Sequence, residues 1–290
     1  MPLLLDLIGN TPLVELTRLS PNPEVKLLAK LEGDNPGGSV KDRTAYFMVK
    51  GAIERGDLKP GMKLIEATSG NTGIALAMIA RLFDIEMELV MPATSTRERV
   101  LTMEAYGAKV TLEESMEAAR DSALEKAAKG GYLILNQFAN PDNWRAHYET
   151  TGPEIWRDTG GGITHFVSSM GTTGTIMGCS RFLKEQNPGV RIVGCQPKDG
   201  ASIPGIRKWP VEYLPAIFER ERVDEVVEVS ENDAVSTTRM LAKQEGIFAG
   251  MSSGGAAFAA IDVAKRIERG TVVFVVCDRG DRYLSGNLFG

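Results

Sequence analysis

Short apolar runs alternate with longer amphipathic segments along the chain, and this order constrains the fold more than any other feature. Six runs have the length and composition of strands, each followed by a helical pattern: residues 63–67, 87–91, 132–137, 165–169, 191–196 and 271–277. Strands that alternate with helices pair in parallel, and the helices then cover both faces of the sheet. The sequence therefore predicts an α/β fold.

The length of the chain predicts more than one domain. At 290 residues it is long for a single core, so we expect two closely associated α/β domains. No Gly/Ser-rich or Pro-rich linker separates them, so any boundary is a compact hinge. The turn-rich segments 32–36 and 140–144 are the candidate crossings, and about a hundred residues lie between them, enough for one small domain.

Composition excludes several classes of function. A net charge of -5 without any basic run argues against nucleic acid as a partner. Three cysteines without C-x-x-C spacing predict neither disulfides nor zinc, and the isolated His147 and His165 predict no metal site. Residues 1–16 lack the basic start of a signal peptide, and no run approaches the roughly 20 apolar residues of a membrane span. We expect a cytoplasmic protein.

Lys41 stands in the first turn of an expected helix. Ser39 is a suitable N-cap, and a buried stripe follows at helical spacing: Ala45, Met48, Val49, Ala52 and Ile53. The positive end of the helix dipole favours the neutral amine, so it lowers the pKa of Lys41 from its ordinary value of about 10.4. A neutral amine is the form that attacks an aldehyde. Taken alone, Lys41 is better explained as a solvated surface lysine, tolerated there at a cost of a few tenths of a kcal/mol.

Three Gly-rich loops follow expected strands or open expected helices, where ligands bind in α/β sheets: 67–73, 170–175 and 250–255. In "GTTGT" (171–175) the glycines let successive N–H groups converge, and the threonines add hydroxyl donors, which suits a phosphate group. Each loop alone is also consistent with an ordinary capping turn. A lysine nucleophile, a phosphate cradle and a serine for a pyridine nitrogen together describe a site for pyridoxal 5'-phosphate, with Lys41 forming the Schiff base.

The motifs, in this order, resemble the fold-type II pyridoxal-phosphate family of the cysteine synthases. They include "IGNTPLVEL" (8–16), "KLEGDNPGGSVKDR" (30–43), "IEATSGNTGIALAMIA" (65–80), "SSMGTTGT" (168–175) and "GIFAGMSSGG" (246–255), and the resemblance spans essentially the whole chain. It implies two three-layer αβα domains with mostly parallel twisted sheets and the cofactor in the cleft between them. Residues 35–145 would form the smaller mobile domain, and residues 1–34 plus 146–290 the larger domain that anchors the cofactor.

The resemblance assigns roles to individual residues. Lys41 would be the Schiff-base lysine, Asn71 would contact the ring hydroxyl oxygen, and Ser252 would face the pyridine nitrogen. The phosphate loop would consist of Gly171, Thr172, Thr173, Gly174 and Thr175, and the α-carboxylate of the substrate would be held by Thr68, Ser69, Thr72 and Gln137.

A neutral serine at the pyridine nitrogen makes the ring a weaker electron sink than a carboxylate would, which favours prompt loss of a β-substituent. The expected reaction is β-replacement: O-acetyl-L-serine and sulfide give L-cysteine through an aminoacrylate. The partners would be small molecules, and the family implies a homodimer. Alternatives are a cysteine synthase using O-phosphoserine, a cystathionine β-synthase, a serine or threonine dehydratase, and a catalytically silent regulatory protein.

Two stretches are similar to the B-type members of the family: "VCDRGDRYL" (276–284) and "ASIPGIRKWPVEYLP" (201–215). In that type Arg207, Cys277 and Asp278 would line a roomier polar pocket, and the guanidinium of Arg207 suits an anionic donor such as thiosulfate, which would give S-sulfocysteine. An ordinary basic surface loop is the alternative for Arg207. Lys208, where an arginine is common, departs from the B-type pattern, and the chain stops at "NLFG" earlier than many relatives.

Overall fold

The computed structural model describes residues 1, 3–68 and 70–290. The chain forms two compact units, one of residues 41–142 and the other of residues 1–40 together with 143–290. Each contains a sheet dominated by parallel strands, so the α/β class predicted from the sequence is confirmed. That the smaller unit moves and the larger one anchors the cofactor stays a prediction.

The larger unit is built on a six-stranded sheet with the order β1-β2-β10-β7-β8-β9. These strands are β1 (Leu13–Glu15), β2 (Val25–Leu31), β7 (His165–Ser169), β8 (Arg191–Pro197), β9 (Glu225–Val229) and β10 (Gly270–Val276). Only β1, at the edge, runs antiparallel to its neighbour. Since β2, β10 and β7 come from distant parts of the sequence, the sheet joins both ends of the chain.

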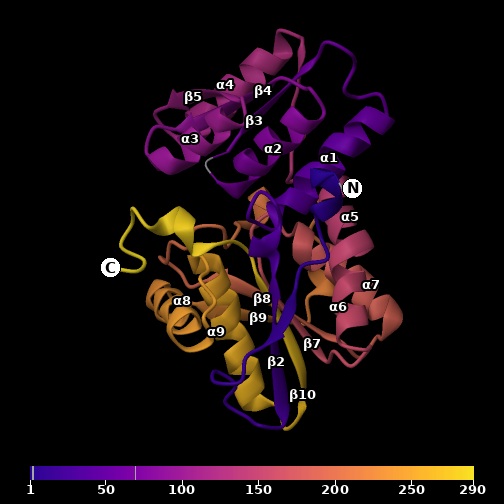
Figure 1. The fold of residues 1–290 in the computed structure, drawn as a ribbon, viewed down its shortest axis with the longest axis vertical. Coiled ribbons are helices and arrows are strands. Elements are labelled where there is room, and N and C mark those ends of the chain that lie inside the picture. Colours follow the sequence, from indigo (N-terminus) through magenta and orange to yellow (C-terminus); the bar gives the residue numbers. More distant parts are fainter. Residues whose placement is uncertain (2, 69) are drawn as a thin grey trace. The chain divides into compact units, whose positions relative to one another are not determined.

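Helices cover both faces of this sheet (Figure 1). On one face α8 (Glu231–Glu245) and α9 (Met251–Arg266) enclose the larger apolar core with β2, β8 and β10. On the other lie α6 (Gly152–Asp158) and α7 (Gly174–Gln186). A π-helix, His147–Thr151, joins α5 (Pro141–Ala146) to α6. Short 3-10 turns complete the unit at Leu4–Leu7, Glu32–Asp34, Val211–Tyr213, Arg220–Arg222 and Gly280–Tyr283.

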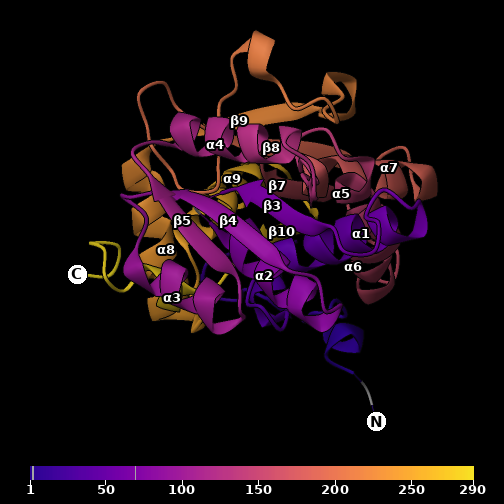
Figure 2. The same cartoon turned by 90° about the horizontal axis from the view of Figure 1, so that it is seen from above.

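The smaller unit has a fully parallel sheet with the order β5-β4-β3-β6. Its strands are β3 (Lys63–Ala67), β4 (Met87–Pro92), β5 (Lys109–Glu113) and β6 (Tyr132–Leu133). Helix α4 (Met116–Ala128) packs on one face, where Ala119 and Ala123 meet Ile65 and Val90. The other face carries α1 (Lys41–Glu54), α2 (Asn71–Leu82) and α3 (Arg97–Ala105), as Figure 2 shows.

The structure corrects three expectations about local structure. The strand expected over 132–137 ends at Leu133, because the chain turns at Asn136, whose φ is +52°. Helix α1 begins at Lys41 itself, one residue later than expected, and the backbone of Ser39 forms an isolated antiparallel bridge with Asp278. Ile53, expected in the buried stripe of α1, is 40% exposed, although Ala52 beside it in the last turn is buried, so the stripe ends at Ala52.

Candidate active site

Lys41 is the first residue of α1, and the chain just before it is fixed. The Val40 N–H donates to the Cys277 carbonyl at 2.8 Å, at the end of β10. Lys41 is half-buried, and the three residues that follow it, Asp42, Arg43 and Thr44, are buried. This is not the setting of an ordinary solvated surface lysine.

The loop between β3 and α2 carries the residues expected to hold the substrate's carboxylate. Thr68 is buried directly after β3, and α2 begins at Asn71 with Gly70 as its N-cap. The Thr72 hydroxyl donates to Gln137 Oε1 at 2.8 Å, so Gln137 joins the first turn of α2. Ser69, which the resemblance adds to this set, lies outside the described residues. The first turn of α2 leaves N–H groups without intrahelical partners, as anion sites require.

The loop 171–175 connects β7 to α7 and has the features of an anion cradle. Thr173 is the N-cap of α7 with φ +69°, a left-handed conformation that is uncommon for a residue with a side chain. Thr173 is 4% exposed, and its hydroxyl has no hydrogen-bond partner among the described residues. A buried hydroxyl of this kind needs a partner, and a phosphate oxygen beside the first N–H groups of α7 provides one.

Three side chains outside the loop fix its shape. Asn143 Nδ2 donates to Thr172 Oγ1 at 3.1 Å, and His147 Nε2 lies 3.2 Å from Thr175 Oγ1. On the other side, Trp209 Nε1 donates to the Gly171 carbonyl at 2.7 Å. Sequence analysis gave no role to Asn143 or Trp209, and it considered His147 only to reject it as a metal ligand. The spacing of four between Asn143 and His147, which places both on one face of a helix, was the available signal.

Ser252 lies in the first turn of α9, close to the phosphate loop. The Ser169 hydroxyl, at the end of β7, donates to the Ser252 carbonyl at 2.7 Å. Gly205 joins the two features: its carbonyl oxygen would be 2.5 Å from a Cβ on Gly171, and a Cβ on Gly205 would be 3.4 Å from Ser252 Oγ. Only a glycine at 171 allows this approach. The larger unit therefore brings together the residues expected at the phosphate and at the ring nitrogen.

The residues expected to recognise the sulfur donor lie in two places. Arg207 is exposed in the loop 197–210, which lines a pocket of about 540 Å³, and its guanidinium lies 6.0 Å from the Trp209 ring. Cys277 is half-buried and Asp278 buried at the end of β10, where Tyr283 donates to Asp278 Oδ2 at 2.6 Å. Lys208 binds Asp199 and Glu228, each at 2.7 Å. These two carboxylates hold the ammonium of Lys208.

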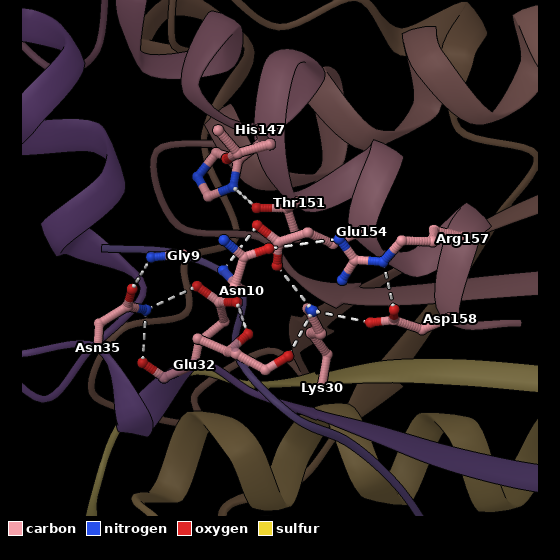
Figure 3. A network of polar contacts seen from close by, with 12 residues as sticks. Gly9, Asn10, Lys30, Glu32, Asn35, His147, Thr151, Glu154, Arg157 and Asp158 are labelled. Atoms are coloured by element: carbon pink, nitrogen blue, oxygen red, sulfur yellow. Dashed lines mark hydrogen bonds and ion pairs between the residues drawn. The ribbon is translucent and has the colours of Figure 1, made fainter. Parts of the chain in front are cut away.

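A buried polar network supports the helix that carries Asn143 and His147 (Figure 3). Lys30 on β2 is fully buried and binds Glu154 Oε2 of α6 at 2.8 Å and the Thr11 carbonyl at 2.7 Å. Glu154 Oε1 accepts from the Asn10 N–H at 2.9 Å. The π-helix just before α6 places His147 Nδ1 2.9 Å from Thr151 Oγ1. Lys30 thus ties the N-terminal loop and β2 to the helical segment behind the phosphate loop.

Within the parts of the chain that the structure describes, no three His, Cys, Asp or Glu residues are grouped as metal ligands. Burial and the nearby Arg191 lower the pKa of His165, whose Nδ1 lies 2.9 Å from the Thr164 hydroxyl. No helix in residues 1, 3–68 and 70–290 is long and apolar enough to cross a membrane.

Comparison with known proteins decides which cofactor this architecture serves. A family model described as pyridoxal-phosphate dependent enzyme matches residues 4–278. The chain belongs to this family of pyridoxal-phosphate-dependent enzymes. Within the family, it is 59% identical over 286 residues to cysteine synthase B of Escherichia coli (strain K12), covering 98% of this chain and 94% of that protein. Cysteine synthase B of Pseudomonas aeruginosa is 57% identical over 291 residues, covering 99% of this chain and 97% of that protein.

Solved structures agree with this family. O-acetylserine sulfhydrylase isoform 3 from Entamoeba histolytica superposes on this pyridoxal-phosphate enzyme with a TM-score of 0.94 at 38% identity, covering 100% of this chain and 91% of the other. The resemblance to fold-type II cysteine synthases is therefore confirmed, together with the dependence on pyridoxal phosphate. The buried Thr173 hydroxyl and the close approach at Gly171 fit its phosphate group.

Proposed function

We propose that this enzyme replaces the acetoxy group of O-acetyl-L-serine with sulfide and so makes L-cysteine. The observation that carries the proposal is the pairing, across Gly205, of a phosphate cradle containing the buried Thr173 hydroxyl with a neutral serine, Ser252. The relatives named cysteine synthase B and O-acetylserine sulfhydrylase support the same substrate. Cysteine formation from O-acetylserine and sulfide by the purified holoenzyme is the direct test, and its absence would refute the proposal.

Separate groups of residues would bind the cofactor and the α-carboxylate of the substrate. The loop 171–175 would hold the phosphate of the cofactor, Asn71 would contact its ring oxygen, and Ser252 would face its ring nitrogen. When bound, pyridoxal phosphate supplies an aldehyde and a ring that withdraws electrons from the substrate Cα. Thr68, Ser69, Thr72 and Gln137 hold the α-carboxylate of the substrate, with the N–H groups at the start of α2 as further donors.

Lys41 acts twice in this scheme. Its amine would hold the cofactor through the aldehyde before substrate enters, and its Nζ would then take the proton from the substrate Cα and later return one. Its half-buried position at the start of α1, where the helix dipole disfavours the charged amine, supports this role. Lys41→Ala should abolish the yellow absorbance of the purified enzyme and its turnover. A variant that keeps both would refute the assignment.

Thiosulfate is the proposed second donor, giving S-sulfocysteine, with Arg207, Cys277 and Asp278 at the pocket that accepts it. The exposed guanidinium of Arg207 beside the pocket formed by 197–210 supports this part of the proposal. Arg207→Ala should reduce turnover with thiosulfate while that with sulfide persists. Lys208→Ala is the matched control, since its ammonium already binds Asp199 and Glu228. An absence of thiosulfate activity in the parent enzyme would refute the proposal that thiosulfate is a second donor.

The alternatives differ in leaving group or nucleophile while keeping the cofactor: use of O-phosphoserine, cystathionine formation from serine, or dehydration of serine or threonine. Comparing O-acetylserine, O-phosphoserine, serine and threonine, each with sulfide, thiosulfate or homocysteine, separates these activities. A catalytically silent regulatory protein would turn over none of them. Lys41 argues against that alternative, because such a protein has no need of the lysine nucleophile.

We further propose that the enzyme is a cytoplasmic homodimer, as the family implies. Sedimentation velocity of the holoenzyme would give the mass of the assembly, and fractionation of cells would give its compartment. A monomer, or recovery outside the cytoplasm, would contradict these proposals.

A further inference from the structure

Glu66 is buried next to the loop proposed to bind the α-carboxylate of the substrate. None of the roles proposed above involves Glu66. It lies in β3, two residues before Thr68, and is 5% exposed. Its Oε2 accepts from the backbone N–H groups of Leu135 at 3.2 Å and Asn136 at 3.4 Å. These two amides are its hydrogen-bond partners within the described parts of the chain. A buried carboxylate held only by main-chain amides orients the backbone that donates to it.

The segment that Glu66 binds is irregular backbone. Strand β6 ends at Leu133, and Asn136 has a φ of +52°, a conformation that few residues adopt. The segment is folded back on itself, because Asn140 Nδ2 donates to the Leu135 carbonyl at 2.9 Å and the Asn140 N–H to the Asn136 carbonyl at 2.9 Å. In the part of the chain that the structure describes, no ladder of hydrogen bonds to a neighbouring strand holds this turn, so bonds from side chains such as Glu66 and Asn140 contribute to its shape.

Gln137 immediately follows the two amides that Glu66 binds. Its Oε1 accepts from the Thr72 hydroxyl at 2.8 Å, at the start of α2. Thr68 packs against the first turn of α2, since a Cβ on Gly73 in that turn would lie 2.9 Å from Thr68 Cγ2. Glu66 therefore connects β3, which Thr68 directly follows, to the segment that presents Gln137.

We propose that Glu66 is a positioning residue for the substrate, which holds the 135–137 turn so that Gln137 meets Thr72 and Thr68 around the α-carboxylate. Glu66 acts through backbone and does not touch the substrate. This inference rests on the carboxylate site proposed above.

Because Glu66 can be protonated, its hold on the 135–137 turn should depend on pH. Burial raises the pKa of Glu66 to about 7, against the opposing effect of the Asn136 and Leu135 amides. The ionisable side chains on the elements packed against β3 are Glu88 of β4, Tyr132 of β6, Arg81 of α2, and Glu117, Arg120, Asp121, Glu125 and Lys126 of α4. None of these side chains hydrogen-bonds Glu66 within the described residues, so its titration depends on the turn that it holds.

Steady-state kinetics of holoenzyme variants with O-acetylserine test the proposal. Glu66→Ala leaves the Leu135 and Asn136 amides without this acceptor, and we expect KM for O-acetylserine to rise about tenfold while kcat changes less than twofold. Glu66→Gln keeps an acceptor oxygen and should restore KM to within about twofold of the parent. Glu88→Ala is the matched control. Glu88 is similarly buried on the neighbouring strand, but it binds Lys126, Tyr132 and Thr111. The KM of the Glu88→Ala enzyme for O-acetylserine should therefore not change.

The pH profile provides a second measurement that survives poor folding of Glu66→Ala. In the parent, KM for O-acetylserine should rise as pH falls through about 7, by no more than about twofold, because the protonated carboxyl keeps an acceptor oxygen, as Glu66→Gln does, but is a weaker acceptor than the carboxylate. The same step should be missing from Glu66→Gln. Amide hydrogen exchange in peptides covering 134–140 should be faster in Glu66→Ala only.

Gln137→Ala separates failure of this inference from failure of the carboxylate site. If Gln137→Ala raises KM but Glu66→Ala does not, or if Glu66→Gln keeps the pH step, Glu66 is not a positioning residue and the proposed site stands. If Gln137→Ala leaves KM unchanged, the proposed carboxylate site and the inference both fail.

Discussion

Replacing Lys30 by Met tests how the larger unit supports its phosphate loop. Methionine has a similar length but no charge, so it fills the space while removing the bonds to the Thr11 carbonyl and to Glu154. It also removes the weaker pairing with Asp158 Oδ2 at 3.5 Å. The buried carboxylate of Glu154 then loses the Lys30 ammonium at Oε2, while its Oε1 still accepts from the Asn10 N–H.

Removing one partner of a buried ion pair destabilises a protein by about 3–5 kcal/mol, because the other charge stays buried. This is a large share of the roughly 5–15 kcal/mol that stabilises a typical domain. For a unit of nearly 190 residues, each kcal/mol shifts the midpoint of thermal unfolding by about 2–4 °C. Lys30→Met should therefore lower the midpoint of the larger unit by about 6–20 °C.

Scanning calorimetry at a fixed excess of pyridoxal phosphate measures this shift without a change in bound cofactor. Lys50→Met is the control, since Lys50 and Glu54 form an exposed pair at 3.7 Å that is worth about 0.5 kcal/mol or less. The double variant Lys30→Met/Glu154→Gln removes the stranded charge and should recover part of the loss. A midpoint for Lys30→Met no lower than that of Lys50→Met would refute the reasoning.

Three further predictions follow from the site and the smaller unit. Gly171→Ala should weaken retention of pyridoxal phosphate at least about tenfold on gel filtration, because its Cβ would lie 2.5 Å from the Gly205 carbonyl; unchanged retention would contradict this. Ser252→Asp should slow cysteine formation and change the pH dependence of the cofactor absorbance, since a carboxylate keeps the ring nitrogen protonated; a profile like the parent's would count against Ser252. Burial acts to raise the pKa of Glu88, but Lys126 and its other partners bring it to about 2, below the 4.5 of the unfolded chain. The stability it contributes, at most about 3 kcal/mol, is present above pH 4.5 and lost as pH falls toward 2, and Glu88→Gln should show no such loss in acid unfolding.

The sequence predicted features whose chemistry is local. Lys41 and the loop 171–175 could be predicted because each is recognised from a few adjacent residues. Lys41 is a lysine in the first turn of a helix, and the loop combines glycines and threonines at the end of a strand. The α/β class followed from periodicity in the same way. Such patterns need no knowledge of distant parts of the chain.

What the sequence did not predict depends on distant contacts. The apolar run 132–137 has the composition of a strand, yet its second half turns because Glu66 binds its amides from another strand. The backbone of Ser39 pairs with Asp278 from the other end of the chain. Trp209 reaches the Gly171 carbonyl from a loop after β8. No local pattern encodes these pairings, since each is fixed only once the sheets have formed.

The π-helix at His147–Thr151 determines which side of the helical segment faces each partner. A π-turn holds one residue more than an α-turn, and each residue of an α-helix turns the chain by about 100°. Before the extra residue, Asn143 and His147 face the phosphate loop; after it, Glu154 faces Lys30. Deleting the exposed Glu149 would turn one set away from its partner while leaving every side chain in both sets unchanged. The length of this turn is therefore itself a functional property of the chain.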